Sequence, residues 1–245
     1  RGKGSTLLLR AHMPSGGDAA AMAVCTKHSE VVTQVLRLRA IRAKSCSVDA
    51  EADATQLLHL RHRAGDFFQN NSAATEMLVD FVREHATVHA ADTALLVDCY
   101  SGSGMFALAC APYFPQVIGV EVAVSAVEMA RDNAALNGID NARFIAADAT
   151  ALFAELPSET GPVTAILDPP RAGCDEQFLG QLLHLKPHRV IYISCNPATQ
   201  ARDAQQLVQG GYSIVAVQPF DMFPQTRHIE SVATFELLAR GGKGE

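Results

Sequence analysis

The residues with the clearest chemical potential are a cysteine and a glutamate, each at the end of a predicted strand. Cys195 follows the apolar run 190–193, and Glu230 directly precedes the last predicted strand. A thiolate can act as a nucleophile, and a carboxylate can remove a proton. Residues 168–171, Asp-Pro-Pro-Arg, close an earlier strand, and their prolines stiffen the turn that holds Asp168. The pattern indicates covalent catalysis by Cys195 with Glu230 as the base.

Such a pair suits methyl transfer to C5 of a pyrimidine ring. C5 is too weak a nucleophile to attack a methyl sulfonium directly, but addition of a thiolate to C6 makes C5 enolate-like. A base must then remove the C5 proton so that the thiol can leave. Plainer interpretations stay open, because a cysteine at a strand end is often structural and Glu230 could be an ordinary surface acid. His228 could be a packed or capping histidine.

A glycine-rich turn and acids at successive strand ends outline a second, ligand-binding half. Gly102 lies in the turn 98–104, Asp-Cys-Tyr-Ser-Gly-Ser-Gly, where glycine lets a ligand approach the backbone closely. The turn lacks the third glycine of the dinucleotide fingerprint. Glu121 ends the next strand and could accept from ribose hydroxyls, and Asp148 ends the third strand and could accept from an adenine amino group. These features suit S-adenosylmethionine better than NAD, although each acid could also be a solvated turn residue or a helix cap.

Residues 67–71, Phe-Phe-Gln-Asn-Asn, are unusual because two aromatic residues and three amides directly precede a predicted helix. Asn71 or Ser72 could cap that helix, and the aromatic pair could belong to the core. The functional interpretation places Gln69 over the cofactor or the target base.

Hydrophobic periodicity divides the chain into two regions. Residues 1–66 form a small β-rich subdomain, with strands expected at 6–10 and 31–38. Loops are expected in this subdomain at 14–18 and 49–53. Residues 67–245 form the catalytic domain, in which strands alternate with helices. That alternation predicts an α/β fold with a Rossmann-like, doubly wound and mostly parallel sheet.

The elements of the second region follow from runs of apolar residues between turn signals. The first helix is expected to present one apolar face, made of Met77, Leu78, Phe81 and Val82. Strands are expected at 94–97, 117–120, 142–146, 163–167 and 190–193, closed by an antiparallel pair at 212–218 and 231–238. Helices are expected from about 105 and at 123–136, 149–156, 175–185 and 199–209.

Composition narrows the class of protein further. Apolar residues make up 48% of 245 residues, which is enough for a large core, and no apolar run approaches the roughly 20 residues of a membrane span. The six cysteines lack the short paired spacings of metal sites, so we expect no metal and a reducing compartment. Cys99 and Cys110 lie in apolar settings typical of core residues.

The net charge of −6 argues against an unaided nucleic-acid-binding surface. Basic residues nevertheless gather in the first quarter of the chain, at Arg37, Arg39, Arg42, Lys44, Arg61, His62 and Arg63.

Five ordered segments together resemble the RNA (uracil-5-)-methyltransferase family. They are residues 64–71, 98–106, 168–173, 194–197 and 223–230, and the similarity extends from residue 4 to the C-terminus. The resemblance implies a class I S-adenosyl-L-methionine-dependent enzyme that forms 5-methyluridine in RNA. Cys195 would be the nucleophile and Glu230 the proton acceptor. Gln69, Tyr100, Gly102, Glu121, Asp148 and Asp168 would line the cofactor and target-base site. The family's usual Asn in the glycine turn is here Met105.

The resemblance also implies a substrate, which is the T-loop uridine of tRNA or, as the alternative, a uridine of ribosomal RNA. The base would be flipped out to reach the thiol, and Phe67 or Phe68 could stack on it. The chain begins at Arg1, so we expect a fragment whose RNA-binding β-barrel has been trimmed away. We expect a monomer without membrane contact, located in the cytoplasm, nucleus or mitochondrion.

Three rival functions remain at this stage. A catalytically inactive RNA-binding member of the fold would agree with Met105 but not with the presence of Cys195 and Glu230. An aminomethyltransferase would use the Asp-Pro-Pro turn but would leave Cys195 without a role, and Arg171 replaces the aromatic wall of such sites. A nicotinamide-dependent oxidoreductase lacks its phosphate-binding fingerprint.

Overall fold

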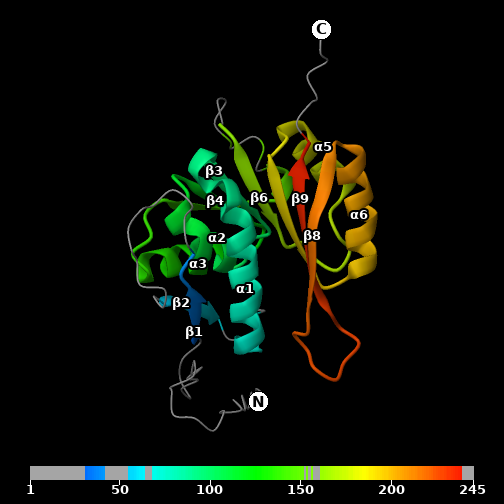
Figure 1. The fold of residues 1–245 in the computed structure, drawn as a ribbon. Helices are drawn as coiled ribbons and strands as arrows, with labels where there is room; N and C mark the ends of the chain where they lie inside the picture. The colour runs from blue at the N-terminus through cyan, green and yellow to red at the C-terminus, as the bar shows by residue number, and fades with distance from the viewer. Residues whose placement is uncertain are drawn as a thin grey trace, which may run out of the picture.

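A mostly parallel sheet organises the molecule. The computed structural model describes residues 31–41, 55–63, 68–151, 153, 156 and 161–238. Within these residues seven strands form one sheet in the order β5-β4-β3-β6-β7-β9-β8 (Figure 1). The strands are β3 (Leu95–Cys99), β4 (Val117–Glu121), β5 (Ala142–Ala146), β6 (Val163–Leu167), β7 (Arg189–Ser194), β8 (Tyr212–Phe220) and β9 (Glu230–Leu237). Strands β3 to β7 run parallel, and β9 is antiparallel to both β7 and β8. This confirms the predicted fold class.

Helices cover both faces of this sheet, which explains why the central strands are continuous apolar runs. Every residue of β3, β6 and β7 is buried, as expected for parallel strands between two helical layers. The helices are α1 (Ser72–Ala86), α2 (Met105–Cys110), α3 (Val124–Leu136), α5 (Glu176–Leu185) and α6 (Pro197–Gln209). Single 3₁₀ turns form η1 (Thr87–Asp92), η2 (Ala111–Tyr113) and η3 (Ala149–Ala151).

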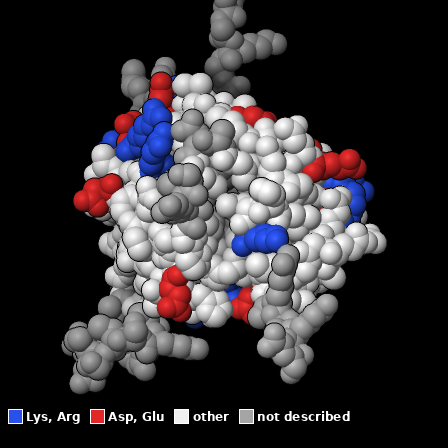
Figure 2. Space-filling model, turned by 90° about the horizontal axis from the view of Figure 1, so that it is seen from above, with Lys and Arg blue, Asp and Glu red and all other residues white. Residues whose placement is uncertain are grey.

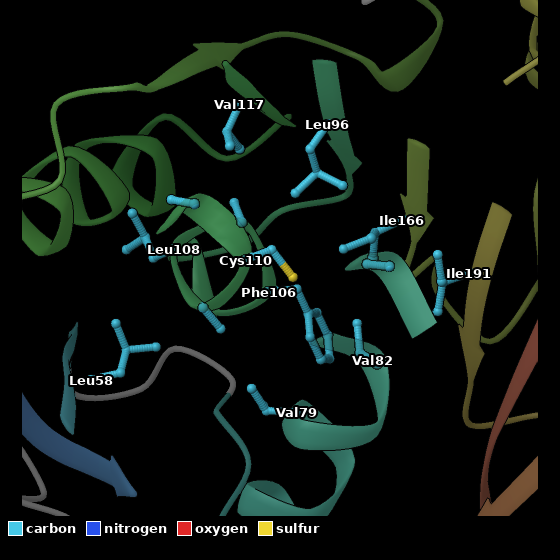
Figure 3. Close-up of a cluster of buried hydrophobic side chains, with 14 of the residues drawn as sticks. Leu58, Val79, Val82, Leu96, Phe106, Leu108, Cys110, Val117, Ile166 and Ile191 are labelled. Carbon is cyan, nitrogen blue, oxygen red and sulfur yellow. The ribbon is translucent and has the colours of Figure 1, made fainter. Parts of the chain in front are cut away.

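The two sheet faces carry separate hydrophobic clusters. On one face, residues of α1, α2 and α3 pack against inward side chains of β3, β4, β6 and β7. Figure 3 shows this packing, with the ring of Phe106 of α2 beside Val82 of α1. On the other face, α5 and α6 contribute Phe178, Leu182 and other residues to the second cluster. Cys99 and Cys110 are both fully buried, as predicted.

A two-stranded hairpin lies beside this sheet and shares its first cluster. β1 (Val31–Arg39) and β2 (Thr55–Arg63) pair antiparallel. Alternate residues turn inward, and the buried leucines Leu36, Leu38, Leu58 and Leu60 join the core of α1 and α2. The alternation of apolar and polar residues is the reason this segment forms strands with one buried face.

A fully buried arginine on α1 fastens the hairpin. The Arg83 guanidinium donates to the carbonyl oxygens of Ala109 and Arg39, to Asp80 Oδ1, to Gln56 Oε1 and to the Tyr113 hydroxyl. A buried charge is tolerated because these partners and the Asp80 carboxylate compensate its lost hydration.

Several detailed expectations can be compared with the described residues. The strand at 31–38 is confirmed as β1, whereas β2 was not predicted as a separate strand. Met77 was wrongly placed on the apolar face of the first helix: its side chain is 63% exposed, and Val79 is buried instead. Of the helix expected at 149–156, residues 149–151 form the 3₁₀ turn η3. The predicted strand 6–10 and the loops 14–18 and 49–53 lie outside the described residues.

Among the described residues, no helix combines the length and the apolar character that crossing a membrane requires. The division of the chain at residue 66 falls in a range that the structure does not describe, so it stays a prediction.

Candidate functional site

A cavity of about 990 Å³ opens at the carboxyl ends of the parallel strands. Its walls contain every residue that the sequence singled out for the site: Gln69, Tyr100, Gly102, Glu121, Asp148, Asp168, Cys195 and Glu230. These residues come from segments up to 161 positions apart. The sheet brings most of them together, because the parallel strands end, and the antiparallel strand β9 begins, at one edge. The structure thus places the predicted residues in one site, while their individual roles stay proposals.

The glycine turn after β3 forms one wall of the cavity. Tyr100, Gly102 and Gly104 all have positive φ, of 67°, 52° and 90°, a region that non-glycine residues rarely adopt. A Cβ at Gly102 would meet nothing within 4 Å, so the backbone of this residue faces open space. At Gly104 a Cβ would lie 2.9 Å from the Phe144 ring, and only glycine fits. The turn therefore exposes backbone to the cavity, as close approach of a ligand requires.

The acids that end β4 and β5 are held by short local hydrogen bonds. Glu121 accepts from the backbone N–H of Gly102 (3.1 Å) and of Ala123 (2.9 Å). Asp148 accepts from the hydroxyl and the backbone N–H of Thr150, and these two bonds lower its pKa. A carboxylate has about four acceptor sites, so both groups keep capacity for the hydroxyl or amino donors of a ligand.

Among the buried side-chain oxygens without a partner in the described part of the chain are one at the cavity wall and one beneath the glycine turn. Gln69, which is 8% exposed and lines the cavity, has no partner at Oε1. Asp98 is fully buried beneath the turn; its Oδ2 accepts from the Ala107 N–H at 2.9 Å, and its Oδ1 has no partner. Burial raises the pKa of Asp98 to about 7, a shift that the Ala107 bond opposes and the Glu121 charge reinforces. Open backbone, acceptors with spare capacity and unpaired buried oxygens fit a ligand rich in hydroxyl and amino donors, such as S-adenosylmethionine.

Cys195 and Glu230 face each other across the ends of two antiparallel strands. Ser194 of β7 pairs with Ser231 of β9, and one step further outward along both strands the positions are Cys195 and Glu230. Residues opposite each other in an antiparallel pair have Cα atoms about 4.5–5.5 Å apart. The thiol and the carboxyl group therefore lie at the same region of the cavity.

Burial gives these groups unusual proton affinities. Glu230 is only 4% exposed, and desolvation raises its pKa to about 7. Desolvation also raises the pKa of Cys195; the Glu230 charge adds to this, and the guanidinium of Arg171 opposes it. Desolvation, followed by the charges of Glu230, Asp98 and Glu121, raises the pKa of Asp168 well above its ordinary value.

Helix α6 holds the Asp-Pro-Pro-Arg turn in place through contacts that the sequence did not reveal. Asp203 accepts from the Cys174 N–H (2.8 Å) and from the Tyr192 hydroxyl (2.7 Å). Asn196 and Thr199 both donate to the carbonyl oxygen of Arg171. One sequence signal was available: Gly173 has φ +81°, and a Cβ there would lie 2.6 Å from both Arg202 and Asp203. A glycine two residues after the Pro-Pro-Arg sequence indicates such a close approach.

The face drawn in Figure 2 carries scattered charges. Among the described residues on this face, acidic and basic side chains are scattered between uncharged ones, and neither sign forms a continuous patch. A phosphate backbone is attracted by clustered Lys and Arg, and the described residues of this face do not form such a cluster.

The sheet order, the glycine turn and the strand-end acids around one cavity define a Rossmann-like methyltransferase fold. A ribosomal RNA methylase from Streptococcus thermophilus shares this fold at 17% identity, with a TM-score of 0.52 over 68% of this chain and 97% of that chain. The particular family follows from sequence comparison: the chain belongs to the tRNA (uracil-5-)-methyltransferase family, whose profile matches residues 50–237.

Individual relatives agree with this membership. A tRNA (uracil(54)-C(5))-methyltransferase of Schizosaccharomyces pombe is 41% identical over 180 residues, covering 70% of this chain and 34% of the relative. An uncharacterized RNA methyltransferase of Gloeobacter violaceus is 46% identical over 170 residues, covering 69% of this chain and 36% of the relative.

Among solved structures, a Pyrococcus abyssi tRNA (uracil-54, C5)-methyltransferase in complex with S-adenosyl-L-homocysteine has a TM-score of 0.62 at 31% identity. The match covers 82% of this chain and 50% of that chain. The chain spans about a third of the length of the curated relatives it matches.

Proposed function

We propose that this chain carries the catalytic part of an S-adenosylmethionine-dependent enzyme that methylates C5 of a uridine in tRNA. The observation that carries the proposal is that Cys195 and Glu230 are the next positions after the Ser194–Ser231 pair and line one cavity together with the glycine turn. Family membership and a relative solved with S-adenosyl-L-homocysteine support the cofactor. Relatives named for uracil 54 support the T-loop uridine of tRNA as the target.

Cys195 begins the proposed reaction. Its thiolate attacks C6 of the uracil, which forms a carbon–sulfur bond and moves an electron pair to C5 and O4. S-adenosylmethionine, when bound, supplies a methyl group to that nucleophilic C5. Glu230 then removes the C5 proton, the C5–C6 double bond re-forms, and Cys195 leaves as the thiolate. The net change is replacement of the C5 hydrogen by methyl, with the proton taken up by Glu230.

The electrostatics of the site support this division of roles. A base works best when its pKa lies near the working pH, and the pKa of Glu230 is about 7. The pKa of Cys195 is raised in the ligand-free cavity by burial and by the Glu230 charge. The positively charged sulfonium of a bound cofactor, close to Asp168, Glu121 and Glu230, would offset the repulsion between these carboxylates and the Cys195 thiolate. It would therefore favour the thiolate form of Cys195. Arg171 contributes a fixed positive charge in the same direction.

The target base must leave its stack to reach a thiol at the cavity wall. Phe68 was expected to be available for stacking on that base, but its ring stacks on His62 with centroids 5.0 Å apart. Phe67 lies outside the described residues. The monomeric state and the cellular compartment stay predictions.

A trapping experiment tests the proposal. The protein is incubated with S-adenosylmethionine and tRNA containing 5-fluorouridine, and the mixture is separated by denaturing electrophoresis. Fluorine blocks removal of the C5 substituent, so a covalent protein–RNA band is expected with the wild type and with the control Cys110→Ala, but not with Cys195→Ala.

Each other outcome changes a defined part of the proposal. A band with ribosomal RNA but not with tRNA keeps the chemistry and replaces the substrate. A band that persists in Cys195→Ala refutes the thiol as nucleophile. Cofactor binding without a band on either RNA refutes catalysis by this chain and favours an inactive member of the fold.

A further inference from the structure

The β1–β2 hairpin touches the glycine turn of the cofactor cavity. Asn133 on α3, which is fully buried, accepts from the Arg61 N–H (2.7 Å) and donates to the Arg61 carbonyl (3.0 Å). The same amide donates to the carbonyl oxygen of Ser103 at 3.1 Å. One side chain therefore fastens β2 and the backbone of the turn together.

A second amide repeats this contact one helical turn further along α3. Asn137 accepts from the N–H of His59 (2.9 Å) and donates to its carbonyl oxygen (2.7 Å). Residues four apart lie on one face of a helix. The two asparagine side chains therefore form hydrogen bonds with the backbone of β2, as the backbone of a neighbouring strand would. This double clamp sets the position of β2 against α3.

The clamp places His62 at the turn. Neighbouring residues of a strand point to opposite faces, so Arg61 and Arg63 are exposed while His62 turns inward and is 4% exposed. Its Nδ1 lies 3.1 Å from the Ser103 hydroxyl, and its ring stacks on Phe68 at an interplanar angle of 18°. Both His62 and Ser103 line the cavity. His62 thus differs from its basic neighbours Arg61 and Arg63, because it is buried and lines the cavity while they are exposed.

We propose that His62 is a positioning residue that holds Ser103, and with it the glycine turn, in the conformation that binds the cofactor, so that cofactor affinity depends on docking of the hairpin. The inference rests on the cofactor of the proposed function. Ser103 stands between two glycines, which lose more conformational entropy on ordering than any other residue. A turn held by the His62 side chain and by the Asn133 amide has less of that entropy to lose when the ligand binds.

Isothermal calorimetry of S-adenosylhomocysteine binding to the full chain tests the inference without needing RNA or turnover. His62→Phe keeps the stack on Phe68 and removes the hydrogen bond to Ser103. We expect Kd to rise about three- to tenfold, the equivalent of one hydrogen bond. His62→Asn presents a polar atom near the position of Nδ1 and is expected to restore most of the affinity. Leu57→Ala, at an exposed position on the outer face of the same strand, is the matched control and is expected to bind as the wild type does.

A double-mutant cycle separates positioning through Ser103 from a general loss of structure. Ser103→Ala alters only the turn and should weaken binding by the same factor as His62→Phe. In the Ser103→Ala background, His62→Phe should have no further effect, because the bond is already absent. Unchanged Kd in both single variants, or additive losses in the double variant, overturns the proposal. If His62→Phe does not fold, unchanged affinity of Ser103→Ala is sufficient to overturn it.

The wild-type measurement separates this inference from the function on which it rests. A wild-type chain that does not bind S-adenosylhomocysteine refutes the proposed cofactor and the inference with it. A wild-type chain that binds, with His62→Phe binding equally well, refutes the positioning role alone.

Discussion

Glu121 and Glu230 are both glutamates at strand ends, and both face the same cavity, but their surroundings differ. Glu121 is partly exposed and accepts two backbone N–H groups. Glu230 is buried, and desolvation raises its pKa to about 7. Backbone N–H donors thus surround the carboxylate at one strand end, whereas burial at the other gives a pKa suited to the proton transfer that we propose. Hydrogen bonding and burial, rather than residue type, decide between the two.

The aspartates of the two sides repeat the contrast. Exposed Asp148 has its pKa lowered by two hydrogen bonds from Thr150. Asp168, on the side of the cysteine, has its pKa raised by desolvation and by neighbouring carboxylates. Local hydrogen bonds therefore lower the pKa of an acid on the β4–β5 side of the cavity, and burial raises the pKa of acids on the β6–β7–β9 side.

The largest expected effect separates the two glutamates in catalysis. Glu230→Gln should lower kcat about 10²- to 10⁴-fold, the usual contribution of a positioned base. The covalent RNA adduct should accumulate on unmodified uridine, because the C5 proton is no longer removed. Glu121→Gln should instead raise the KM for the cofactor without accumulation of adduct. Single-turnover kinetics with denaturing gels measure both, and equal behaviour of the two variants would break the comparison.

The pH dependence of the wild type gives the next largest effect. The Cys195 thiol and Glu230 must both be ionised, so kcat/KM should fall about a hundredfold per pH unit below the pKa of Glu230, which is about 7, and about tenfold per unit just above it. Because the pKa of the Cys195 thiol is also raised, the rate should continue to rise on the alkaline side. A profile that is flat between pH 5 and pH 8 would show that neither group limits the reaction.

Stability should change in opposite directions for the two glutamates. The pKa of Glu230 rises from 4.5 to about 7 on folding, so the folded state binds this proton more tightly and stability falls as pH increases from about 4.5 through 7. Glu230→Gln should therefore stabilise the protein at pH 8 by up to about 3 kcal/mol and should have little effect near pH 4. Glu121→Gln should destabilise it by about 1 kcal/mol, since one accepted N–H loses its partner. Urea unfolding at the two pH values measures both changes; destabilisation by both variants at pH 8 would contradict the contrast.

The smallest expected effect concerns Asp148. Asp148→Asn should weaken S-adenosylhomocysteine binding about three- to tenfold, because a neutral amide accepts a ligand hydrogen bond more weakly than a carboxylate. Thermal stability should hardly change, since the group is exposed and its bonds to Thr150 are local. Asp140→Asn, an exposed acid before the start of β5, is the control. Equal affinities of the two variants would remove Asp148 from the site.

Prediction from sequence succeeded where the signal was local. The buried strands β3, β6 and β7 are continuous apolar runs, and the glycine turn was expected where the positive φ angles are found. It failed where distant segments decide. Met77 matched the apolar face of α1 by type but lies on its exposed side. The strand β2 mixes His and Arg with leucines, and its burial depends on partners in α1 and α3.

The sequence by itself determined the order of the strands from β3 to β9 and the acids at the strand ends. It also identified a cysteine and a glutamate beside the strands β7 and β9. These follow from periodicity and residue type, which neighbouring residues establish. Only the tertiary structure decided that Cys195 faces Glu230, that Asp203 clamps the Asp-Pro-Pro-Arg turn and that His62 reaches the glycine turn. The physical reason is that burial, proton affinity and hydrogen-bond geometry depend on groups that approach one another only after the chain has folded.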